Sequence, residues 1–353
     1  MIWAGGGVTA SGAGEELRVL AERLQAPVVM TERALGVLPA THPLALTALG
    51  ARALAPHVDA VLVVGSRFLN RRAAPPFAAP GADFVYLNVD DAAMEAPRAP
   101  GIQVHADAAH GLAALAAELD GRGQPASRAA QTSAVRQWCE AYVAMVGPQH
   151  AWAQALRAAV PEHGVVVPDL TAVGYVLPVA YPVLAPHTLV TSGYQGNLGF
   201  ALPVALGMAV GDPQRPVVSL SGDGGFGMSL GELATVRKLD ANLVMVVMND
   251  NRFGNVHLVH QGRFGHSHGT ELVNPDFVAL AGAFGIPAAR VDGPDALRTA
   301  LADAVATPGP VLLEVPVGPM PSPWFLLSER FAAPGPVPPD PLGQRAEAST
   351  VAK

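Results

Sequence analysis

The sequence is poor in cysteine, in charged residues and in aromatic residues. Its 353 residues contain one cysteine, Cys139, which excludes a disulfide within the chain and any Cys-X-X-Cys metal site and favours a reducing compartment. A lone thiol in a helical stretch is most simply a packing residue. Only 14% of residues are charged and 6% are aromatic, against 50% hydrophobic. The apolar content is high enough for a folded protein.

Basic charge and long hydrophobic runs are also scarce. Lys and Arg number 22 against 29 Asp and Glu, a net charge of -7, and no stretch concentrates basic residues as nucleic-acid binding requires. The longest apolar run, around Leu198 to Val210, is interrupted by Pro203 and is too short to cross a bilayer. The first residues lack the basic and apolar segments of a secretion signal. We therefore expect a cytoplasmic protein that binds neither nucleic acid nor membranes.

Residues 1–120 alternate short apolar runs with amphipathic stretches, which is typical of parallel βαβ units. We predict strands at 28–30, 60–64 and 84–89 and helices at 15–25 and 108–119. The spacing of Leu17, Leu20 and Leu24 places these leucines on one helix face. The pattern predicts a Rossmann-like layer.

A second domain repeats this alternation after a segment rich in Gly, Gln, Pro, Ser and Arg. We place a linker and connecting helix at 121–145, the second domain at 146–330 and a disordered tail at 331–353. The fold class is therefore α/β, with two doubly wound parallel sheets. In the second domain we predict strands at 164–167, 189–190, 216–221, 243–248 and 311–315 and helices at 151–160, after 171, and at 199–210, 229–239 and 275–284.

The most informative motif is Ser221-Gly222-Asp223-Gly224-Gly225-Phe226, whose Gly224 is separated by 26 residues from Asn251 in Asn249-Asp250-Asn251. Asp223 and Asp250 each follow a predicted central strand, so both lie at the carboxyl edge of a parallel sheet, where such folds bind ligands. Carboxylates there, with a main-chain oxygen near Arg252, suit Mg²⁺. Gly224 and Gly225 would let a diphosphate approach the N-terminus of a helix that begins near Gly227.

Each motif taken singly is more often an ordinary turn than a site. Found together at equivalent strand ends, they resemble the thiamine diphosphate signature. The chain is similar to acetolactate synthase-like members of the 2-keto acid decarboxylase and carboligase superfamily over most of its length. Further segments that carry the resemblance are Gly5-Gly6-Gly7-Val8, Ala26-Pro27-Val28, the stretch from Thr191 to Phe200, Asn274-Pro275-Asp276-Phe277 and Pro321-Ser322-Pro323-Trp324.

The resemblance implies thiamine diphosphate as cofactor. It would be bound through Mg²⁺ on the second domain, the diphosphate-binding domain, which follows the Rossmann-like central domain. Asp223, Asp250 and the main-chain oxygen of Arg252 would ligate the metal; many relatives have Asn at the position of Asp250. Leu198 would wedge between the two cofactor rings, and Gly196 would offer its carbonyl to the aminopyrimidine. The residues implied to bind cofactor are Gly196, Leu198, Gly222, Gly224, Gly225, Phe253, Gly254 and Asn255.

Asn255, Val256 and Val259 would line the substrate cleft, where a 2-keto acid is decarboxylated with or without carboligation. Synthases of this family commonly have a large aromatic residue near Val259, so the substrates can differ from the acetolactate pair.

The sequence departs from the family at its start. No glutamate in the first domain matches the one that protonates the cofactor's aminopyrimidine, because the pyrimidine-binding domain has no counterpart in the 353 residues. We name no catalytic acid. We expect a pyrimidine-binding-domain subunit or another copy in a homo-oligomer to complete the site, or else a chain that is inactive alone.

Other interpretations stay open. His257, His260, His266 and His268 can be exposed loop residues, a zinc site or proton-transfer groups. The segment from Gly5 to Ala10 loosely fits a dinucleotide fingerprint, so FAD on the first domain is a weaker possibility. The competing functions are a non-catalytic or regulatory homologue that retains the diphosphate site and a Rossmann-type nucleotide-binding protein.

Overall fold

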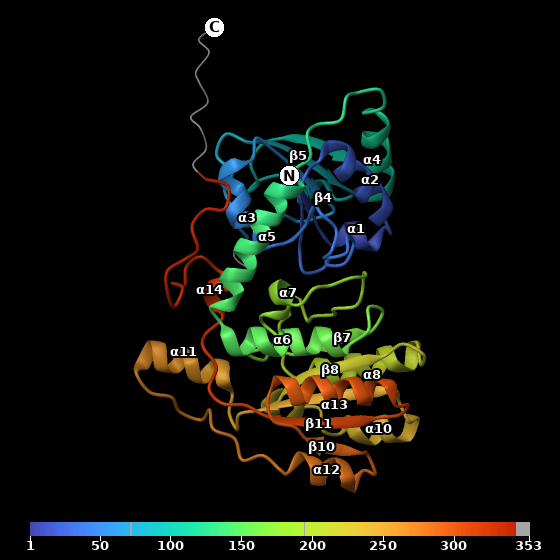
Figure 1. Ribbon diagram of the computed structural model, residues 1–353, viewed down its shortest axis with the longest axis vertical. Coiled ribbons are helices and arrows are strands. Elements are labelled where there is room, and N and C mark those ends of the chain that lie inside the picture. Colours follow the sequence, from blue (N-terminus) through green and yellow to red (C-terminus); the bar gives the residue numbers. More distant parts are fainter. Residues whose placement is uncertain (71–72, 194, 344–353) are drawn as a thin grey trace. The chain divides into compact units, whose positions relative to one another are not determined.

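The computed structural model describes residues 1–70, 73–193 and 195–343 (Figure 1). The chain divides into two compact units, each built on its own parallel sheet. The first comprises Met1–Tyr142, Leu184–Pro186 and the chain from Ala333, and the second comprises Val143–Val183 and His187–Ala332. The predicted class of two parallel α/β sheets is confirmed. Tyr194 of the family-like stretch and residues 344–353 of the predicted tail lie outside the described residues.

The first unit contains a six-stranded sheet of order β3-β2-β1-β4-β5-β6, in which all neighbours are parallel. The strand order reverses between β1 and β4, which is where open sheets of this kind form a ligand crevice. The strands are β1 (Ile2–Ala4), β2 (Val28–Met30), β3 (Ala45–Thr47), β4 (Ala60–Val64), β5 (Asp83–Asn88) and β6 (Ile102–His105).

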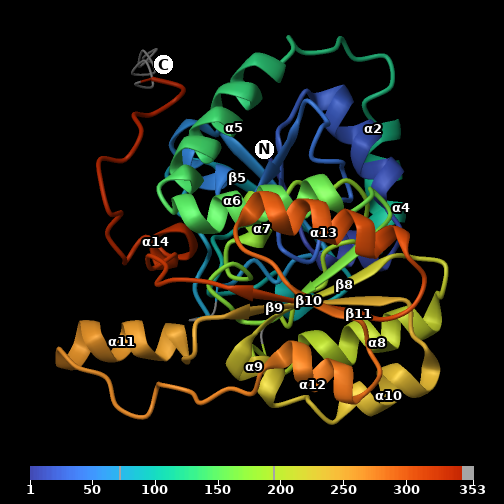
Figure 2. The same cartoon turned by 60° about the horizontal axis from the view of Figure 1, so that its bottom comes forward.

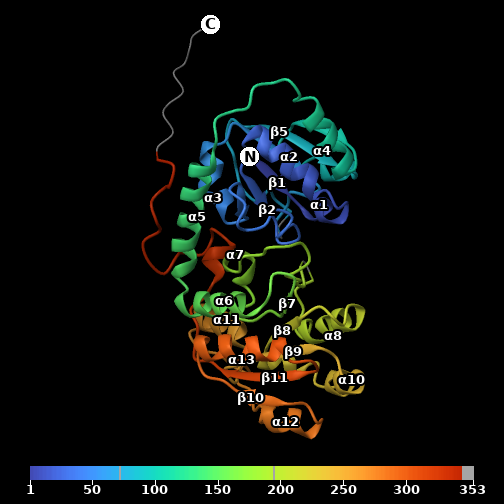
Figure 3. The same cartoon turned by 45° about the vertical axis from the view of Figure 1, so that its right-hand side comes forward.

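The helices of this unit follow the predicted apolar spacing. Leu17 and Leu20 of α2 (Gly14–Leu24) are buried. This helix packs against α4 (Ala108–Ala117), and Figure 3 shows both on the side of the sheet opposite α3 (Gly50–Leu54). The remaining helical segments are α1 (Gly6–Ala10), α5 (Ala129–Ala144) and the 3₁₀ turns η1 (Ala55–His57) and η2 (Asp91–Ala93).

The second unit contains a five-stranded parallel sheet of order β10-β11-β9-β8-β7. Its central strands are apolar on both faces, and every residue from Leu243 to Met248 is buried. Such strands need helices on both sides. The strands are β7 (Val165–Pro168), β8 (Val217–Gly222), β9 (Leu243–Asn249), β10 (Ala288–Arg290) and β11 (Val311–Pro316).

Helices cover both faces of this sheet, and Figure 2 shows α6 and α13 on one side and α8, α10 and α12 on the other. A single apolar core joins the second group to the strands, with Leu202, Leu233 and Phe277 among its fully buried members. The helices are α6 (Gly147–Ala159), α7 (Leu177–Ala180), α8 (Ala201–Gly211), α9 (Asp223–Gly227), α10 (Glu232–Leu239), α11 (Gly254–Phe264), α12 (Phe277–Ala283), α13 (Pro294–Ala306) and α14 (Trp324–Leu327).

Two local predictions were wrong. The strand expected at Leu189-Val190 is only an isolated bridge between Leu189 and Val166, because the chain there leaves the sheet edge after one pairing. The helix expected to begin near Gly227 begins at Asp223 instead, with Gly222 in an extended conformation as its N-cap. Glycines that read as a loop in the sequence are thus wound into the first helical turn.

The linker and tail contain more ordered contacts than their composition indicates. The helix α5 begins at Ala129, inside the segment rich in Gly, Pro and Ser. Within the first unit, Trp138 Nε1 donates to the Pro338 carbonyl at 3.0 Å, and His57 lies 2.8 Å from the Asp340 carboxylate. A disordered tail had been predicted from residue 331, and these bonds fix part of it against the first unit. The domain boundaries themselves stay predictions.

Candidate functional site

The carboxylate of Asp223 lies at the edge of the second sheet, where β8 ends and α9 begins. Its side chain is 2% exposed. Burial raises the pKa of Asp223, and the Asn274 side chain and the backbone amides of Gly224, Asn251 and Arg252 act in the opposite direction by donating to it. The carboxylate is thus removed from water but surrounded by neutral donors. These donors fix the orientation of the carboxylate and partly offset the effect of burial.

Asp250 follows β9, the neighbour of β8, and faces the same edge as Asp223. Burial first, and then the negative charge of Asp223, raise the pKa of Asp250 to about 6. Two carboxylates that repel each other in a partly buried position offer the hard oxygen ligands that Mg²⁺ requires. The predicted juxtaposition of these two residues is therefore present in the structure. Their role as metal ligands, with the Arg252 carbonyl, stays a prediction.

The backbone between Asp250 and α11 brings its amides to Asp223 through one left-handed residue. Asn251 has φ 56°, a conformation that asparagine adopts more readily than most residues. This turn points the Asn251 and Arg252 amides at Asp223. Its short path also brings Gly254 close to Asp250, because a Cβ at Gly254 would lie 3.0 Å from Asp250 Oδ2.

Gly224 and Gly225 are required by the protein's own packing. A Cβ on Gly224 would lie 2.5 Å from the Phe253 ring, and one on Gly225 would lie 2.4 Å from Asp169 Oδ2. The predicted reason for both glycines was close approach by a diphosphate. The structure adds a second reason, which is that two side chains of this chain already occupy the space beside them.

Asp169 is a buried carboxylate at this edge that the sequence did not reveal as a site residue. It follows β7, is 2% exposed, and accepts the Gly199 amide at 2.9 Å and the Leu170 amide at 2.9 Å. Burial raises its pKa, which these amides and that of Phe200 oppose. Asp169 therefore fixes the turn that contains Leu198 beside the Gly224-Gly225 turn. Only its position directly after a strand could have drawn attention to it.

Leu198 is half-buried in the turn before α8, between two glycines with left-handed backbones, Gly196 at φ 57° and Gly199 at φ 73°. A Cβ on Gly199 would lie 3.4 Å from the Gly225 carbonyl oxygen, so the two predicted cofactor-binding turns touch. The structure thus brings Leu198 into the neighbourhood of Gly225. Its wedge role, and the role of the Gly196 carbonyl, stay predictions.

The helix α11 contains no buried residue, and Figure 2 shows it extending to one side of the sheet. Val256 and Val259 are 43% and 50% exposed. Asn255 accepts a hydrogen bond from Trp324 Nε1 at 2.9 Å, which ties the start of α11 to the segment around α14. The substrate cleft predicted at these three residues stays a prediction.

The histidines of this region are not brought together around a metal position. His257 Nδ1 lies 2.9 Å from Ser267 Oγ and 4.0 Å from the Glu271 carboxylate. In the part of the chain that the structure describes, no three or more His, Cys, Asp or Glu side chains are grouped so that they could hold a metal ion. The zinc interpretation therefore has no support from the geometry.

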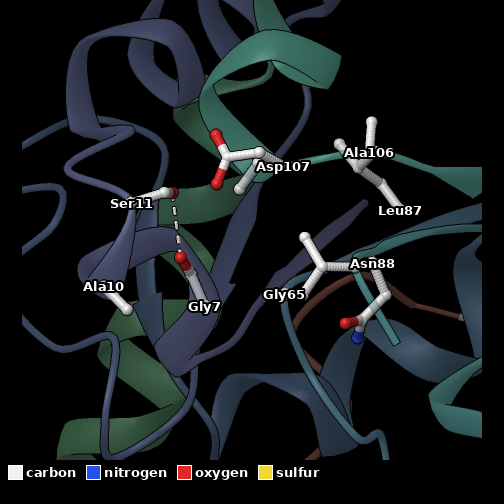
Figure 4. A pocket seen from close by; sticks show the side chains of 10 residues that line it. Gly7, Ala10, Ser11, Gly65, Leu87, Asn88, Ala106 and Asp107 are labelled. Atoms are coloured by element: carbon white, nitrogen blue, oxygen red, sulfur yellow. Dashed lines mark hydrogen bonds between the residues drawn. The ribbon is translucent and has the colours of Figure 1, made fainter.

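A small cleft in the first unit lies at the carboxyl ends of β1, β4 and β5 (Figure 4). It encloses about 190 Å³ and is lined by Ser11, Asn88 and Asp107, among others. Backbone groups beside the cleft are hydrogen-bonded within the chain. The Gly7 amide donates to the Gly65 carbonyl at 2.8 Å, and Ser11 Oγ donates to the Gly7 carbonyl at 2.9 Å. FAD on the first unit stays the weaker alternative that the Gly5–Ala10 segment suggested.

Cys139 is buried, and its burial raises the pKa of the thiol to about 12. A thiol that stays protonated at neutral pH is a poor nucleophile, which fits the predicted packing role. Among the described residues, no helix combines the length and apolar character that crossing a membrane would require.

Comparison with known protein families matches both units. The family model described as "Thiamine pyrophosphate enzyme, central domain" matches residues 1–115, and "Thiamine pyrophosphate enzyme, C-terminal TPP binding domain" matches residues 171–315. The second match contains the Asp223 and Asp250 edge of the sheet. The carboxylate site therefore lies in a domain whose relatives bind this cofactor.

The chain is also similar to acetolactate synthases. It is 28% identical to the acetolactate synthase isozyme 1 large subunit of Escherichia coli strain K12, over 89% of this chain and 58% of that protein. It is 29% identical to the probable acetolactate synthase large subunit of Methanocaldococcus jannaschii, over 90% of this chain and 57% of that one. It is 31% identical to the probable chloroplastic acetolactate synthase 2 of Oryza sativa subsp. japonica, over 90% of this chain and 52% of that protein. The chain spans little more than half the length of these relatives.

The raised pKa of Asp250 predicts a pH-dependent effect of replacing it. An aspartate that titrates near 6 in the fold and near 3.8 in the unfolded chain binds its proton more tightly when folded. The free energy of unfolding therefore falls as the pH rises from about 4 to about 6, because Asp250 ionises less readily in the fold, and it is not regained above that range. In protein treated with a chelator, Asp250→Asn should raise the thermal midpoint at pH 7.5 and leave it nearly unchanged at pH 4.

Differential scanning calorimetry at the two pH values measures this effect. The matched control is Asp303→Asn, on the exposed face of α13, which should shift neither midpoint. An equal shift from Asp250→Asn at both pH values would show that the fold does not raise the pKa of Asp250.

Proposed function

Because this chain belongs to the thiamine pyrophosphate enzyme family, we propose that its second unit binds thiamine diphosphate through Mg²⁺ held by Asp223, Asp250 and the Arg252 carbonyl. We propose further that it acts on a 2-keto acid, as a decarboxylase or carboligase similar to the acetolactate synthases. The observation that carries the proposal is the pair of Asp223 and Asp250 at the ends of adjacent strands, where the charge of Asp223 helps raise the pKa of Asp250.

The surrounding groups fit a cation and a diphosphate. The two carboxylates supply hard anionic oxygens, and a divalent cation between them would remove their repulsion. Gly222, Gly224 and Gly225 add no side chain of their own at the start of α9. Gly254 and Asn255 would bound the site at the start of α11, and the Phe253 ring closes it beside Gly224. When bound, thiamine diphosphate supplies a carbon nucleophile and an electron sink for decarboxylation.

Leu198 would shape the bound cofactor. It stands on a turn that Asp169 fixes through the Gly199 amide at 2.9 Å and that lies against the Gly225 carbonyl. A bulky apolar side chain held rigidly at this place would stand between the two cofactor rings and keep the bound cofactor bent into a V shape. This would bring the exocyclic nitrogen of the aminopyrimidine near the thiazolium C2–H and favour its deprotonation.

The proton donor for the aminopyrimidine would come from outside these 353 residues. The two family matches concern the central and C-terminal domains of this enzyme family, and neither includes a pyrimidine-binding domain. Apolar side chains stand exposed on α11 and beside the site, which suits contact with another domain. They are Met228, Val256, Val259, Phe264 and Val273. We propose that a pyrimidine-binding domain completes the site there.

Removing the proposed metal ligand tests cofactor binding. Asp223→Ala should abolish Mg²⁺-dependent binding of thiamine diphosphate and keep the fold, since it removes an anionic ligand at a strand end and opens no apolar cavity. The matched control is Asp250→Asn, which should retain binding, because an amide oxygen can still ligate. Isothermal titration calorimetry with and without Mg²⁺ measures both. Unchanged affinity in Asp223→Ala would refute the metal site.

The requirement for a second domain has its own test. With the 353-residue chain alone, C2–H exchange of bound thiamine diphosphate should be slower than in complete enzymes by about 10²–10⁴, the usual cost of a lost acid–base group. Proton NMR of the bound cofactor in D₂O follows the exchange directly. Fast exchange in the chain alone would mean that these residues already contain the proton relay, and the proposal of an outside donor would fail.

A further inference from the structure

The side-chain amide of Asn274 joins the ends of β8 and β9. Its Nδ2 lies 2.7 Å from Asp223 Oδ2, 3.1 Å from Asn249 Oδ1 and 3.2 Å from Asn251 Oδ1. A side-chain amide has only two N–H donors, so these three oxygens share them. Asn274 itself comes from the segment that leads into α12, far along the chain from either strand. One neutral group thus fixes three oxygens of the carboxylate edge.

The contact with Asp223 is the shortest of the three and has a consequence for ligand binding. It occupies Oδ2 and so fixes the rotation of the carboxylate. A neutral amide does this without cancelling the negative charge, whereas a lysine or arginine at this place would pair with the carboxylate and compete with a cation. Ligating carboxylates are commonly held by such an outer group, whose loss weakens metal affinity by about 10–100-fold.

An ion pair between the buried Glu314 and the half-exposed Arg290 fixes the orientation of this amide network. Glu314 in β11 is 3% exposed, and its Oε2 accepts from Arg290 Nε at 3.0 Å and Nη2 at 2.8 Å. Its Oε1 accepts from Asn249 Nδ2 at 2.9 Å. Because a carboxylate only accepts, the Asn249 nitrogen must face Glu314. The Asn249 oxygen must then face Asn274 and the Asn251 amide, which donates to it at 3.1 Å.

We propose that Asn274 is a positioning residue that holds Asp223 for its cation, and that the buried Glu314, paired with Arg290, fixes Asn274 through Asn249. The network runs from β10 and β11 across β9 to the carboxylate after β8, so it orients the site from within the sheet. This inference rests on the proposed function, because it requires Asp223 to ligate the cation.

The test measures cation affinity rather than turnover. Mn²⁺, a paramagnetic substitute for Mg²⁺, is titrated into the full chain with saturating thiamine diphosphate, and free Mn²⁺ is read from its electron paramagnetic resonance signal. Asn274→Ala should raise the Mn²⁺ dissociation constant by about 10–100-fold. Glu314→Gln should raise the Mn²⁺ dissociation constant by a smaller factor. The Gln side chain can still offer Asn249 an oxygen, but its amide N–H donors then face the donors of Arg290.

Controls separate the site from general stability. Asn242→Ala removes an asparagine of the same unit whose Nδ2 reaches only the Pro213 carbonyl, at 3.4 Å, and should leave Mn²⁺ affinity unchanged. Thermal midpoints measured with a chelator report whether each variant is folded. If Asn274→Ala does not fold, Asn274→Ser, which keeps a polar side chain but removes Nδ2, takes its place with the same expected loss.

The outcomes distinguish this inference from the function on which it rests. One outcome is that the wild-type chain binds Mn²⁺, Asp223→Ala does not, and a folded Asn274 variant binds it within twofold of the wild type. This outcome would overturn the positioning role and leave the proposed function standing. A wild-type chain that binds no Mn²⁺ with thiamine diphosphate would overturn both. Weakening by Asn274→Ala and Glu314→Gln, but not by Asn242→Ala, would support the inference.

Discussion

The repulsion between Asp223 and Asp250 is the interaction on which the rest of the second unit's edge depends. Water would screen two carboxylates on an exposed loop. Here burial of Asp250 itself, and then the weakly screened charge of Asp223, raise the pKa of Asp250 to about 6. The fold tolerates the charges by surrounding Asp223 with amide donors from Gly224, Asn251, Arg252 and Asn274. The charge of Arg252 lowers the pKa of Asp250 but does not outweigh burial and the charge of Asp223, so keeping the two anions close is costly unless a further cation joins them.

Parallel pairing is what brings these groups together. The register sets Gly222 opposite Met248, so the next residues of β8 and β9, Asp223 and Asn249, stand at matching positions. Asp250 lies one residue beyond, and the left-handed Asn251 then reverses the chain so that its amide and that of Arg252 turn back to Asp223. If β9 slid by one residue between its neighbours β8 and β11, Asp250 would stand opposite Asp223 and Asn249 would move away from Glu314.

The sequence was sufficient for the central strands and for the two aspartates, because long apolar runs followed at once by polar residues mark the ends of such strands. The short edge strands β3, β6 and β10 were not predicted. It was insufficient for Asp169 and Glu314, because each looks like an isolated acidic residue beside an apolar run. The role of Glu314 depends on Arg290 and Asn249, which reach it only through the order β10-β11-β9. The start of α9 was misplaced because glycines favour a loop in isolation, whereas contacts with Phe253 and Asp169 hold Gly224 and Gly225 in a helical turn.

The charged groups of this network do not contact Asp223, and the groups that do contact it are neutral. The one arginine in the Asn274 network, Arg290, pairs with Glu314, so this ion pair adds no net charge beside Asp223. The groups that touch Asp223 are neutral amides, which orient its carboxylate and leave its full charge for a cation. A basic side chain in direct contact would have stabilised the cation-free protein more, by pairing with the anion. The site therefore retains a cost in the empty state that binding a divalent cation would remove.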